Sequence, residues 1–336
     1  MFLATQTAST GREFSPACIM TICVLTFVYN DWPALWALLP LIDSELGNAG
    51  LAAEMLIVDD GSTQAAPSCL PVSFRALHVI RVLRLRKNLG HQRAIATGLA
   101  YIYDHLSYDA IVLMDGDGED RPADAVRMVR IVEKDPTAIV FAERSKRSET
   151  PLFVFFYQVY RLMHVLLTGT AIRVGNFSVI PSSLLGGLVV DMNLWNHYAA
   201  CVYVSNAKTS TISTERGKRL DGQSKLHFTS LVIHGLSAIS CYNEKISVRL
   251  LLCTSFAFTL LLSCLLLTVG IRLFTHLAIP GWATYTAGIV TIILLQLMLL
   301  SLLLSMSLLS GRKRQDIIPL RDYGYFLAEV KELYRV

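Results

Sequence analysis

Short apolar runs alternate with amphipathic stretches through the first half of the chain. The apolar runs are rich in Val, Ile and Leu and predict buried β-strands; the stretches between them, such as Gln92–His105 and Pro122–Glu133, are long enough for crossover helices. The predicted strands lie at Met20–Val28, Glu54–Val58, His78–Leu85, Ala110–Met114 and Ala138–Phe141. This alternation predicts an α/β fold with a mostly parallel sheet and helices on both faces. In such sheets, ligands bind beyond the carboxyl ends of the strands.

A long apolar block occupies the second half of the chain. Arg272 is the only charged residue between positions 250 and 310. Leu250–Ile271 and Tyr285–Leu309 are each long enough, at about 1.5 Å per residue, to cross a hydrocarbon core of about 30 Å as a helix. Pro280 and Gly281 lie between them and predict a turn. We therefore expect two transmembrane helices.

Basic residues on both flanks of this block predict its orientation. Lys245 and Arg249 precede the first span, and the basic run 312–314 follows the second. Cytoplasmic flanks of membrane spans carry an excess of Lys and Arg, so both flanks are expected in the cytosol. The resulting division is a cytosolic domain at 1–227, an amphipathic juxtamembrane segment at 228–249, spans at 250–271 and 285–309, and a cytosolic tail at 310–336.

An aromatic, helical pattern at Pro151–Leu167 leaves two interpretations open. The segment is either a core helix of the cytosolic domain or a helix that lies in the membrane interface. A second apolar helical stretch, Phe228–Ser240, precedes the first span and could lie in the same interface.

Composition supports one sizeable domain attached to a small membrane block. The chain is 53% hydrophobic and 17% charged, against roughly 25% charged residues in ordinary soluble domains. Because the excess is confined to one block, a disordered chain, a wholly soluble protein and a many-span transporter are excluded. The net charge of +4, without a basic stripe, argues against a nucleic-acid partner. The seven cysteines form no CxxC pair, which indicates a reducing compartment and no structural zinc.

Acidic residues follow three of the predicted strands. Asp31 follows the first, Asp59 and Asp60 end the second, and a Met-Asp-Gly-Asp-Gly-Glu-Asp sequence at 114–120 ends the fourth. Asp-Gly pairs are ordinary turn sequences, but three acidic ends in one parallel sheet favour a site. The sequence has no GxGxxG, no P-loop and no EF-hand register, so these alternatives lack their motifs.

The third acidic end predicts a metal site. Asp115, Asp117 and Glu119 occupy alternate positions, which point to one side of an extended segment. Such carboxylates repel one another unless a hard divalent cation with oxygen ligands lies between them. Gly116 and Gly118 would let the backbone approach a bound phosphate closely.

Together these motifs resemble glycosyltransferase family 2, which has the GT-A fold, and more closely its polyprenyl-phosphate branch. That branch includes dolichol-phosphate mannose synthases and bacterial undecaprenyl-phosphate glycosyltransferases. The resemblance runs over nearly the whole chain. It is carried by Thr26–Asp31, Val58–Ser62, Asn88–Ala94, Asp115–Glu119, the pair Arg144 and Arg147, and Arg219–Lys225, followed by the two spans and an aromatic, charged tail at Tyr323–Val336.

The resemblance implies roles for the residues at the strand ends. Tyr29, Asp31, Val58 and Asp60 would hold the nucleoside, with Asp60 facing the base. Asp115 and Asp117, with Gly116 beside them, would engage the ribose, a divalent metal (Mg²⁺ or Mn²⁺) and the diphosphate; Glu119 would complete the metal site.

Cations beyond these strand ends would bind the phosphates of donor and acceptor. The resemblance assigns this to Arg144, Arg219 and Lys225, with Asp117 as the central catalytic carboxylate. Arg147 would assist on the donor side, although a solvated surface position is the alternative for Arg147 and Lys146.

The implied activity is inverting transfer of one sugar from a UDP- or GDP-sugar to a polyprenyl phosphate, for cell-envelope or lipopolysaccharide glycans. The expected location is the bacterial inner membrane, in contact with membrane lipid, and the spans could associate into a homo-oligomer. A processive polysaccharide synthase is the alternative among enzymes, but the Arg-Trp pair of its motif is absent from the sequence. A catalytically silent nucleotide-binding scaffold is the alternative outside enzymes.

Three positions depart from the family pattern. Phe27 replaces a proline, Glu119 replaces a glutamine, and Asn176 stands where relatives often carry Asp. If that Asp is a general base, this chain lacks it. A phosphate monoester has a second pKa near 6, so the acceptor is largely dianionic at neutral pH and needs positioning more than deprotonation.

Overall fold

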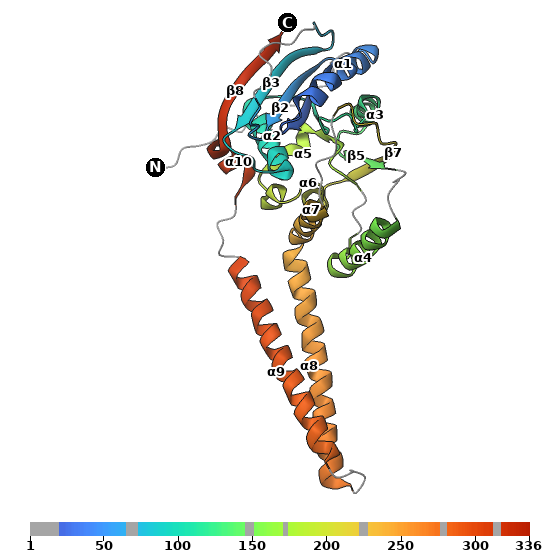
Figure 1. The fold of residues 1–336 in the computed structure, drawn as a ribbon, viewed down its shortest axis with the longest axis vertical. Coiled ribbons are helices and arrows are strands. Elements are labelled where there is room, and N and C mark those ends of the chain that lie inside the picture. The colour runs from blue at the N-terminus through green and yellow to red at the C-terminus, as the bar shows by residue number, and fades with distance from the viewer. Residues whose placement is uncertain are drawn as a thin grey trace.

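An eight-stranded sheet forms the centre of the described structure. In the computed structural model, the described residues are 20–64, 73–144, 151–170, 174–221, 228–275, 281–311 and 317–336. The strands of the sheet are β1 (Ile22–Val28), β2 (Ala53–Asp59), β3 (Leu77–Leu85), β4 (Ala110–Leu113), β5 (Ile139–Arg144), β6 (Ser178–Pro181), β7 (Thr209–Thr214) and β8 (Leu327–Arg335). Their spatial order is β7-β5-β6-β4-β1-β2-β3-β8. β2, β3 and β8 lie side by side in Figure 1.

The central strands are parallel and in register. β1 lies between β2 and β4 and is parallel to both; β2 is parallel to β3. β6 runs antiparallel to its neighbours β4 and β5, while β7 is parallel to β5. The expected α/β fold with a mostly parallel sheet is confirmed, and the five predicted strands all form, with ends shifted by a few residues.

Helices cover both faces of the sheet. Side chains alternate along β1, so Ile22 and Val24 join one buried cluster while Cys23 and Leu25 join another. The first cluster includes residues of α1 and α3, and the second includes residues of α2, α5 and α6. These helices are α1 (Trp32–Asn48), α2 (His91–His105), α3 (Pro122–Lys134), α5 (Ser182–Val189) and α6 (Tyr198–Val204), and a short helix η1 (Met192–Trp195) precedes α6.

The segment expected to be a C-terminal tail instead completes the sheet. α10 (Pro319–Asp322) and η2 (Tyr323–Phe326) lead into β8, which pairs antiparallel with β3 from Leu85↔Leu327 to Val79↔Arg335. The Tyr323 hydroxyl donates a hydrogen bond to Asp104 of α2, which holds the returning chain against the domain. Strands that precede and follow the two long helices therefore belong to one sheet.

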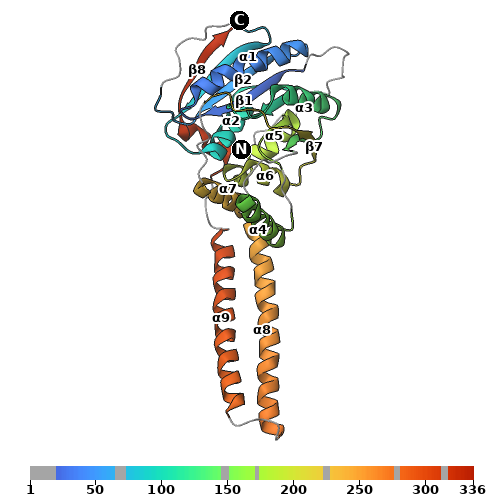
Figure 2. The same cartoon turned by 45° about the vertical axis from the view of Figure 1, so that its right-hand side comes forward.

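Two long apolar helices project from this domain. α8 (Asn243–Phe274) and α9 (Trp282–Gly311) lie side by side below the sheet (Figures 1 and 2). Both are long and apolar enough to cross a membrane, and little of either is buried within the protein. Ser301 donates a hydrogen bond of 3.0 Å to the Thr254 hydroxyl, which joins the two helices. α8 begins well before the predicted span because its polar first turns continue the same helix.

α4 (Pro151–Thr168) lies at the base of the domain, near α7 (Phe228–Ser240) and the start of α8 (Figures 1 and 2). Its apolar side chains Leu162, Met163 and Leu166 are 62%, 54% and 69% exposed, so α4 is not a core helix. Arg249 of α8 donates hydrogen bonds to the carbonyls of Leu166 (3.4 Å) and Leu167 (3.1 Å). This contact aligns the end of α4 with the beginning of the apolar part of α8.

Candidate active site

The carboxyl ends of β1 and β2 are joined by Asn30. Its left-handed backbone (φ 50°) turns the chain sharply after β1. The Asn30 N–H donates to the Ser62 hydroxyl at 2.9 Å, and its side-chain oxygen accepts from the Thr63 N–H at 2.9 Å. These hydrogen bonds tie the two strand ends together into one edge. Several of the predicted site residues lie along this edge.

Asp60 holds the loop that leads into α2. Its carboxylate accepts hydrogen bonds from the backbone N–H groups of Leu89 (2.7 Å) and Gly90 (2.9 Å). Burial raises the pKa of Asp60 to about 6, although the two backbone donors act in the opposite direction. The residue expected to face the nucleotide base thus has a structural function: it links the end of β2 to the start of α2.

The other residues expected to hold a nucleoside differ in accessibility. Val58 is fully buried. Its side chain packs against Gly98 of α2, so closely that a Cβ added to Gly98 would lie 2.9 Å from a Val58 methyl group. Its side chain therefore lies in the core, so only its backbone is left to contact a nucleoside at the sheet edge. Tyr29 is 42% exposed and presents a ring at this edge. Asp31 follows it and forms an ion pair with Arg219.

The acidic loop after β4 does not adopt the expected extended shape. A turn at Gly116 and Asp117 is followed by Gly118 in the left-handed region (φ 86°). Asp117 Oδ1 accepts from the Glu119 N–H at 3.0 Å, and the Glu119 carboxylate accepts from Arg216 Nε at 2.8 Å. The predicted convergence of three carboxylates on one point is therefore wrong. In the described residues, no three His, Cys, Asp or Glu side chains are grouped closely enough to hold a metal ion.

Arg219 joins two of the predicted carboxylates. Its guanidinium contacts Asp117 at 3.0 Å and Asp31, and its Nε donates to the Asp221 carbonyl at 2.9 Å. Arg219 therefore connects the ends of β1 and β4 to the segment after β7. A cation in this place reduces the repulsion between two carboxylates of separate strands.

The segment 215–221 lies directly on the acidic loop. The Gly217 N–H donates to the Glu119 carbonyl at 2.8 Å, and the Leu220 N–H donates to the Asp117 carbonyl at 3.0 Å. A Cβ on Gly118 would lie 2.5 Å from the Leu220 side chain, and one on Gly116 would lie 3.0 Å from the Phe27 carbonyl. Contacts within the chain therefore leave no room for a side chain at Gly118, where the backbone is also left-handed, and little room at Gly116.

His91, the first residue of α2, also lies in this site. The Asn176 amide nitrogen is 2.6 Å from His91 Nε2, and the Phe27 ring meets the imidazole edge-on at 4.1 Å between centroids. His91 Nε2 lies 4.0 Å from Asp115 Oδ1. The surrounding protein desolvates the ring and lowers its pKa to about 4, although Asp117 acts in the opposite direction.

The remaining predicted cations are only partly placed. Arg144 ends β5 opposite Thr214 of β7, at the same edge of the sheet, but its side chain lies outside the described parts. Arg147 and Lys225 lie outside the described residues.

Sequence reasoning missed two side chains of the site, His91 and Arg216. His91 lies inside the Asn-x-Gly-x-x-x-Ala motif, and Arg216 lies three positions before Arg219. Both residues therefore lie in or next to a family motif. They were overlooked because neither occupies a position at which the motif specifies a residue type.

The donor set after β4 fits a hard divalent cation. Mg²⁺ usually keeps several waters and is bound through one or two carboxylates together with substrate phosphates, rather than by a cage of protein ligands. Asp115 and Asp117 supply such carboxylates, and their oxygens suit Mg²⁺ or Mn²⁺.

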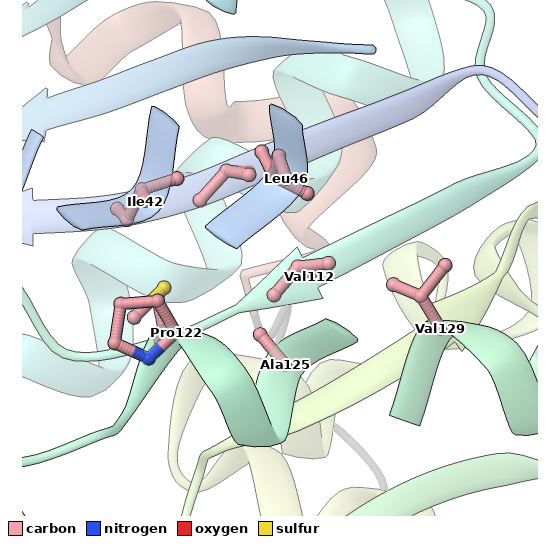
Figure 3. A pocket seen from close by; sticks show the side chains of 8 residues that line it. Ile42, Leu46, Val112, Pro122, Ala125 and Val129 are labelled. Atoms are coloured by element: carbon pink, nitrogen blue, oxygen red, sulfur yellow. The ribbon is translucent and has the colours of Figure 1, made fainter. Parts of the chain in front are cut away.

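A small apolar cavity near this loop is not part of the site. Its volume is about 10 Å³, and it lies between β1, β4, α1 and α3, as Figure 3 shows for Ile42, Leu46, Val112, Ala125 and Val129. A space of this size with an apolar lining stays dry and cannot hold a substrate. It is a packing defect of the core beneath the acidic loop.

The described residues thus combine an α/β sheet that has acidic residues at its parallel strand ends with two apolar helices long enough to cross a membrane. Residues 23–185 match the family model described as Glycosyl transferase family 2. Over these residues the chain is therefore similar to glycosyltransferase family 2.

Curated relatives extend the similarity beyond this domain. The chain is 24% identical to an undecaprenyl-phosphate 4-deoxy-4-formamido-L-arabinose transferase of Sodalis glossinidius, over 80% of this chain and 82% of that protein. It is 26% identical to the protein of the same name from Erwinia tasmaniensis, over 75% and 79%. Among solved structures, glucosyl-3-phosphoglycerate synthase of Mycobacterium tuberculosis with Mg²⁺ and UDP superposes with a TM-score of 0.46 at 14% identity, covering 68% of this chain and 79% of that one.

Proposed function

We propose that this protein transfers a single sugar from a nucleotide-sugar to a polyprenyl phosphate, with inversion at the anomeric carbon. The observation that carries the proposal is the cluster of Asp31, Asp117 and Arg219 at the edge of a domain similar to family 2, whose chain continues into two apolar helices. The names of the relatives support a polyprenyl-phosphate acceptor and a donor that carries a sugar of the 4-deoxy-4-formamido-L-arabinose type.

The donor nucleotide would lie along the edge formed by β1, β2 and β4. Tyr29 offers an exposed ring for the base or ribose, and Asp31 lies beside it. Asp115 and Asp117 would hold Mg²⁺ or Mn²⁺, which when bound offsets the negative charge of the departing nucleoside diphosphate. Release of Asp117 from Arg219 would free its carboxylate for this purpose.

The acceptor needs a positioned phosphate more than a base. Its second pKa is near 6, so it is largely dianionic at neutral pH and already nucleophilic. Arg219, Arg144 and Lys225 would hold the phosphates of donor and acceptor, with Arg147 on the donor side. Holding the acceptor oxygen in line with the departing diphosphate inverts the anomeric carbon in one displacement.

The membrane arrangement would bring this site to the headgroup plane. α8 and α9 would span the bilayer, and the exposed apolar sides of α4 and α7 would lie in its interface. Because β3 and β8 pair in one sheet, both ends of the helical hairpin lie on the same side. The basic flanks favour the cytosolic side of an inner membrane for the whole catalytic domain, at 1–227 together with the segment after the spans.

A donor screen tests the proposal directly. Membranes containing the wild-type protein are incubated with undecaprenyl phosphate, Mg²⁺ or Mn²⁺, and one radiolabelled donor at a time: UDP-4-deoxy-4-formamido-L-arabinose, UDP-glucose, UDP-N-acetylglucosamine or GDP-mannose. We expect one donor to transfer label into an organic-extractable lipid carrying one sugar per phosphate. Membranes with Asp117→Asn are the matched control.

Two outcomes would contradict the proposal. Growth of the labelled product beyond one sugar would indicate a processive polysaccharide synthase. Binding of nucleotide and metal without transfer from any donor would indicate a catalytically silent scaffold.

A further inference from the structure

Two of the three departures from the family pattern meet at one side chain. Phe27 packs edge-on against the His91 imidazole, and Asn176 forms a hydrogen bond of 2.6 Å with His91 Nε2. Phe27 lies on β1 and Asn176 lies just before β6, so they hold the ring from two separate elements. The ring is therefore held in place from two sides.

A chain of hydrogen bonds fixes the orientation of this ring. The Tyr198 backbone N–H, which can only donate, donates to Gln92 Oε1 at 2.7 Å. The other end of the Gln92 amide therefore donates to Asn176 Oδ1, at 3.2 Å. The Asn176 nitrogen must then donate to His91 Nε2, which is the acceptor and carries no proton.

The proton of the imidazole consequently lies on Nδ1. The 4.0 Å approach of Nε2 to Asp115 is then a contact and not an ion pair. Within the described part of the chain, Nδ1 has no hydrogen-bond partner, and 39% of the side chain is exposed. His91 thus presents one oriented N–H donor, on the ring nitrogen other than the one that approaches Asp115.

The order of strands indicates what this donor meets. Tyr29 and Asp31 follow β1, where the nucleoside is proposed to lie, and Asp115 follows β4, where the diphosphate is proposed to lie. The next strand in the same direction is β6, which Asn176 immediately precedes. The group attached to the diphosphate, the transferred sugar, would therefore extend toward His91.

We infer that His91 contacts the donor sugar, with Nδ1–H donating a hydrogen bond to a sugar oxygen, and that Asn176 and Phe27 are positioning residues for this contact. The inference rests on the proposed function and assigns the sugar-facing residue of the same site.

Binding measurements separate a sugar contact from a nucleotide contact. In detergent with Mn²⁺, titration calorimetry compares UDP with UDP-4-deoxy-4-formamido-L-arabinose and UDP-glucose, and GDP with GDP-mannose. His91→Phe keeps the packing against Phe27 and removes both nitrogens. We expect it to bind the cognate nucleotide-sugar about three- to tenfold more weakly, the effect of one lost hydrogen bond, and the nucleoside diphosphate within twofold of wild type.

Matched variants complete this comparison. His78→Phe, at an exposed position near the start of β3 and so at the other end of the strand from the site, should change neither affinity. His91→Asn retains an amide donor near the Nδ1 position and should bind the nucleotide-sugar more tightly than His91→Phe. The inference would be overturned if His91→Phe bound the nucleoside diphosphate and the nucleotide-sugar more weakly by the same factor. It would also be overturned if this variant only raised the KM for undecaprenyl phosphate.

A spectroscopic measurement tests the positioning residues without any substrate. ¹⁵N chemical shifts of the His91 ring should show the Nδ1–H tautomer in the wild type. Asn176→Asp replaces the donor by an acceptor and should move the proton to Nε2 while UDP affinity is retained. A wild-type ring protonated on Nε2 would overturn the assigned chain. If no nucleoside diphosphate binds the wild type, the proposed function fails, whereas the tautomer still tests the positioning of His91.

Discussion

The ends of β2 and β4 carry similar acidic sequences but hold their carboxylates in different ways. At the end of β2, Asp60 accepts two backbone N–H groups, and Asp59 accepts the Ser62 N–H at 2.9 Å. At the end of β4, Asp117 accepts one backbone N–H, from Glu119, but its other oxygen and the Glu119 carboxylate are held by the guanidinium groups of Arg219 and Arg216. Backbone donors are fixed by the fold, whereas arginine side chains can move away.

This difference separates structural carboxylates from those available to ligands. A backbone N–H that loses its acceptor in the interior remains unsatisfied, so the Asp60 contacts cannot be exchanged without cost. An arginine on a partly exposed surface can exchange one anion for another, including a phosphate. The exchangeable contacts at the end of β4 are the reason why the metal and the diphosphate are proposed to bind there.

The largest expected effect is at Asp117. Asp117→Ala should reduce sugar transfer by at least about a thousandfold and abolish metal-dependent nucleotide binding, because this carboxylate would hold the metal at the diphosphate. Transfer assays and calorimetry measure both effects, and an unchanged unfolding midpoint verifies the fold. Full activity in this variant would refute the role of the β4 end.

The opposite pattern is expected at Asp60. Asp60→Ala leaves the Leu89 and Gly90 N–H groups without their acceptor and should lower the free energy of unfolding by about 2–4 kcal/mol. Urea unfolding in detergent, followed by tryptophan fluorescence, measures the loss. Asp43→Ala is the control for the loss of a carboxylate that accepts backbone N–H groups away from the site. Asp43 accepts the N–H groups of Arg75 and Ala76 at the opposite end of the sheet. Unchanged stability with loss of preference between UDP and GDP would show instead that Asp60 reads the base.

Arg219→Ala should separate metal binding from catalysis. Transfer should fall about a hundredfold because a cation for phosphate is lost. Mn²⁺ binding without nucleotide should become several-fold tighter, because Asp31 and Asp117 lose the cation that neutralises them. Electron paramagnetic resonance of free Mn²⁺ measures the second effect. The control Arg216→Ala should change the transfer rate and the Mn²⁺ affinity by no more than about threefold each. Weaker Mn²⁺ binding in Arg219→Ala would contradict the idea that Arg219 and a metal exchange at Asp117.

The smallest effect is expected for Glu119→Gln, which restores the residue found in the family pattern. The Glu119 carboxylate faces Arg216 and not the Asp117 carboxylate, so its charge lies outside the pair of carboxylates proposed to hold the metal. Transfer rate and Mn²⁺ affinity should each change by less than about threefold. A tenfold change in metal affinity would place Glu119 in the metal site as the sequence first indicated.

The sequence predicted β1 to β5 because these strands are largely apolar, but it missed β6, which has only four residues although it lies between β4 and β5. β7, with the sequence Thr-Ser-Thr-Ile-Ser-Thr, and β8, with charges at Glu329, Lys331 and Glu332, lack this signal. Both lie at edges of the sheet, where polar residues are common. β8 also follows the apolar block, so no local pattern connected it with β3.

For the site, the sequence predicted where functional residues lie but not which way they point. The carboxyl ends of parallel strands meet at one edge, so Tyr29, Asp31 and Asp117 were correctly located there. The directions of Asp60 and Glu119 depend on backbone donors at Leu89 and Gly90 and on the turn at Gly118. Contacts between residues so distant in sequence leave no mark on the periodicity of either segment.

The pairing of β8 with β3 also bears on how the protein is made. During translation, β3 emerges long before β8, and both long helices are synthesised between them. At about 5–20 residues per second, the outer edge of β3 stays unpaired for many seconds, and unpaired edges recruit strands from other chains. Insertion of the helical hairpin into the bilayer would bring the following residues back to this edge, so delivery to the membrane and protection from aggregation become one event.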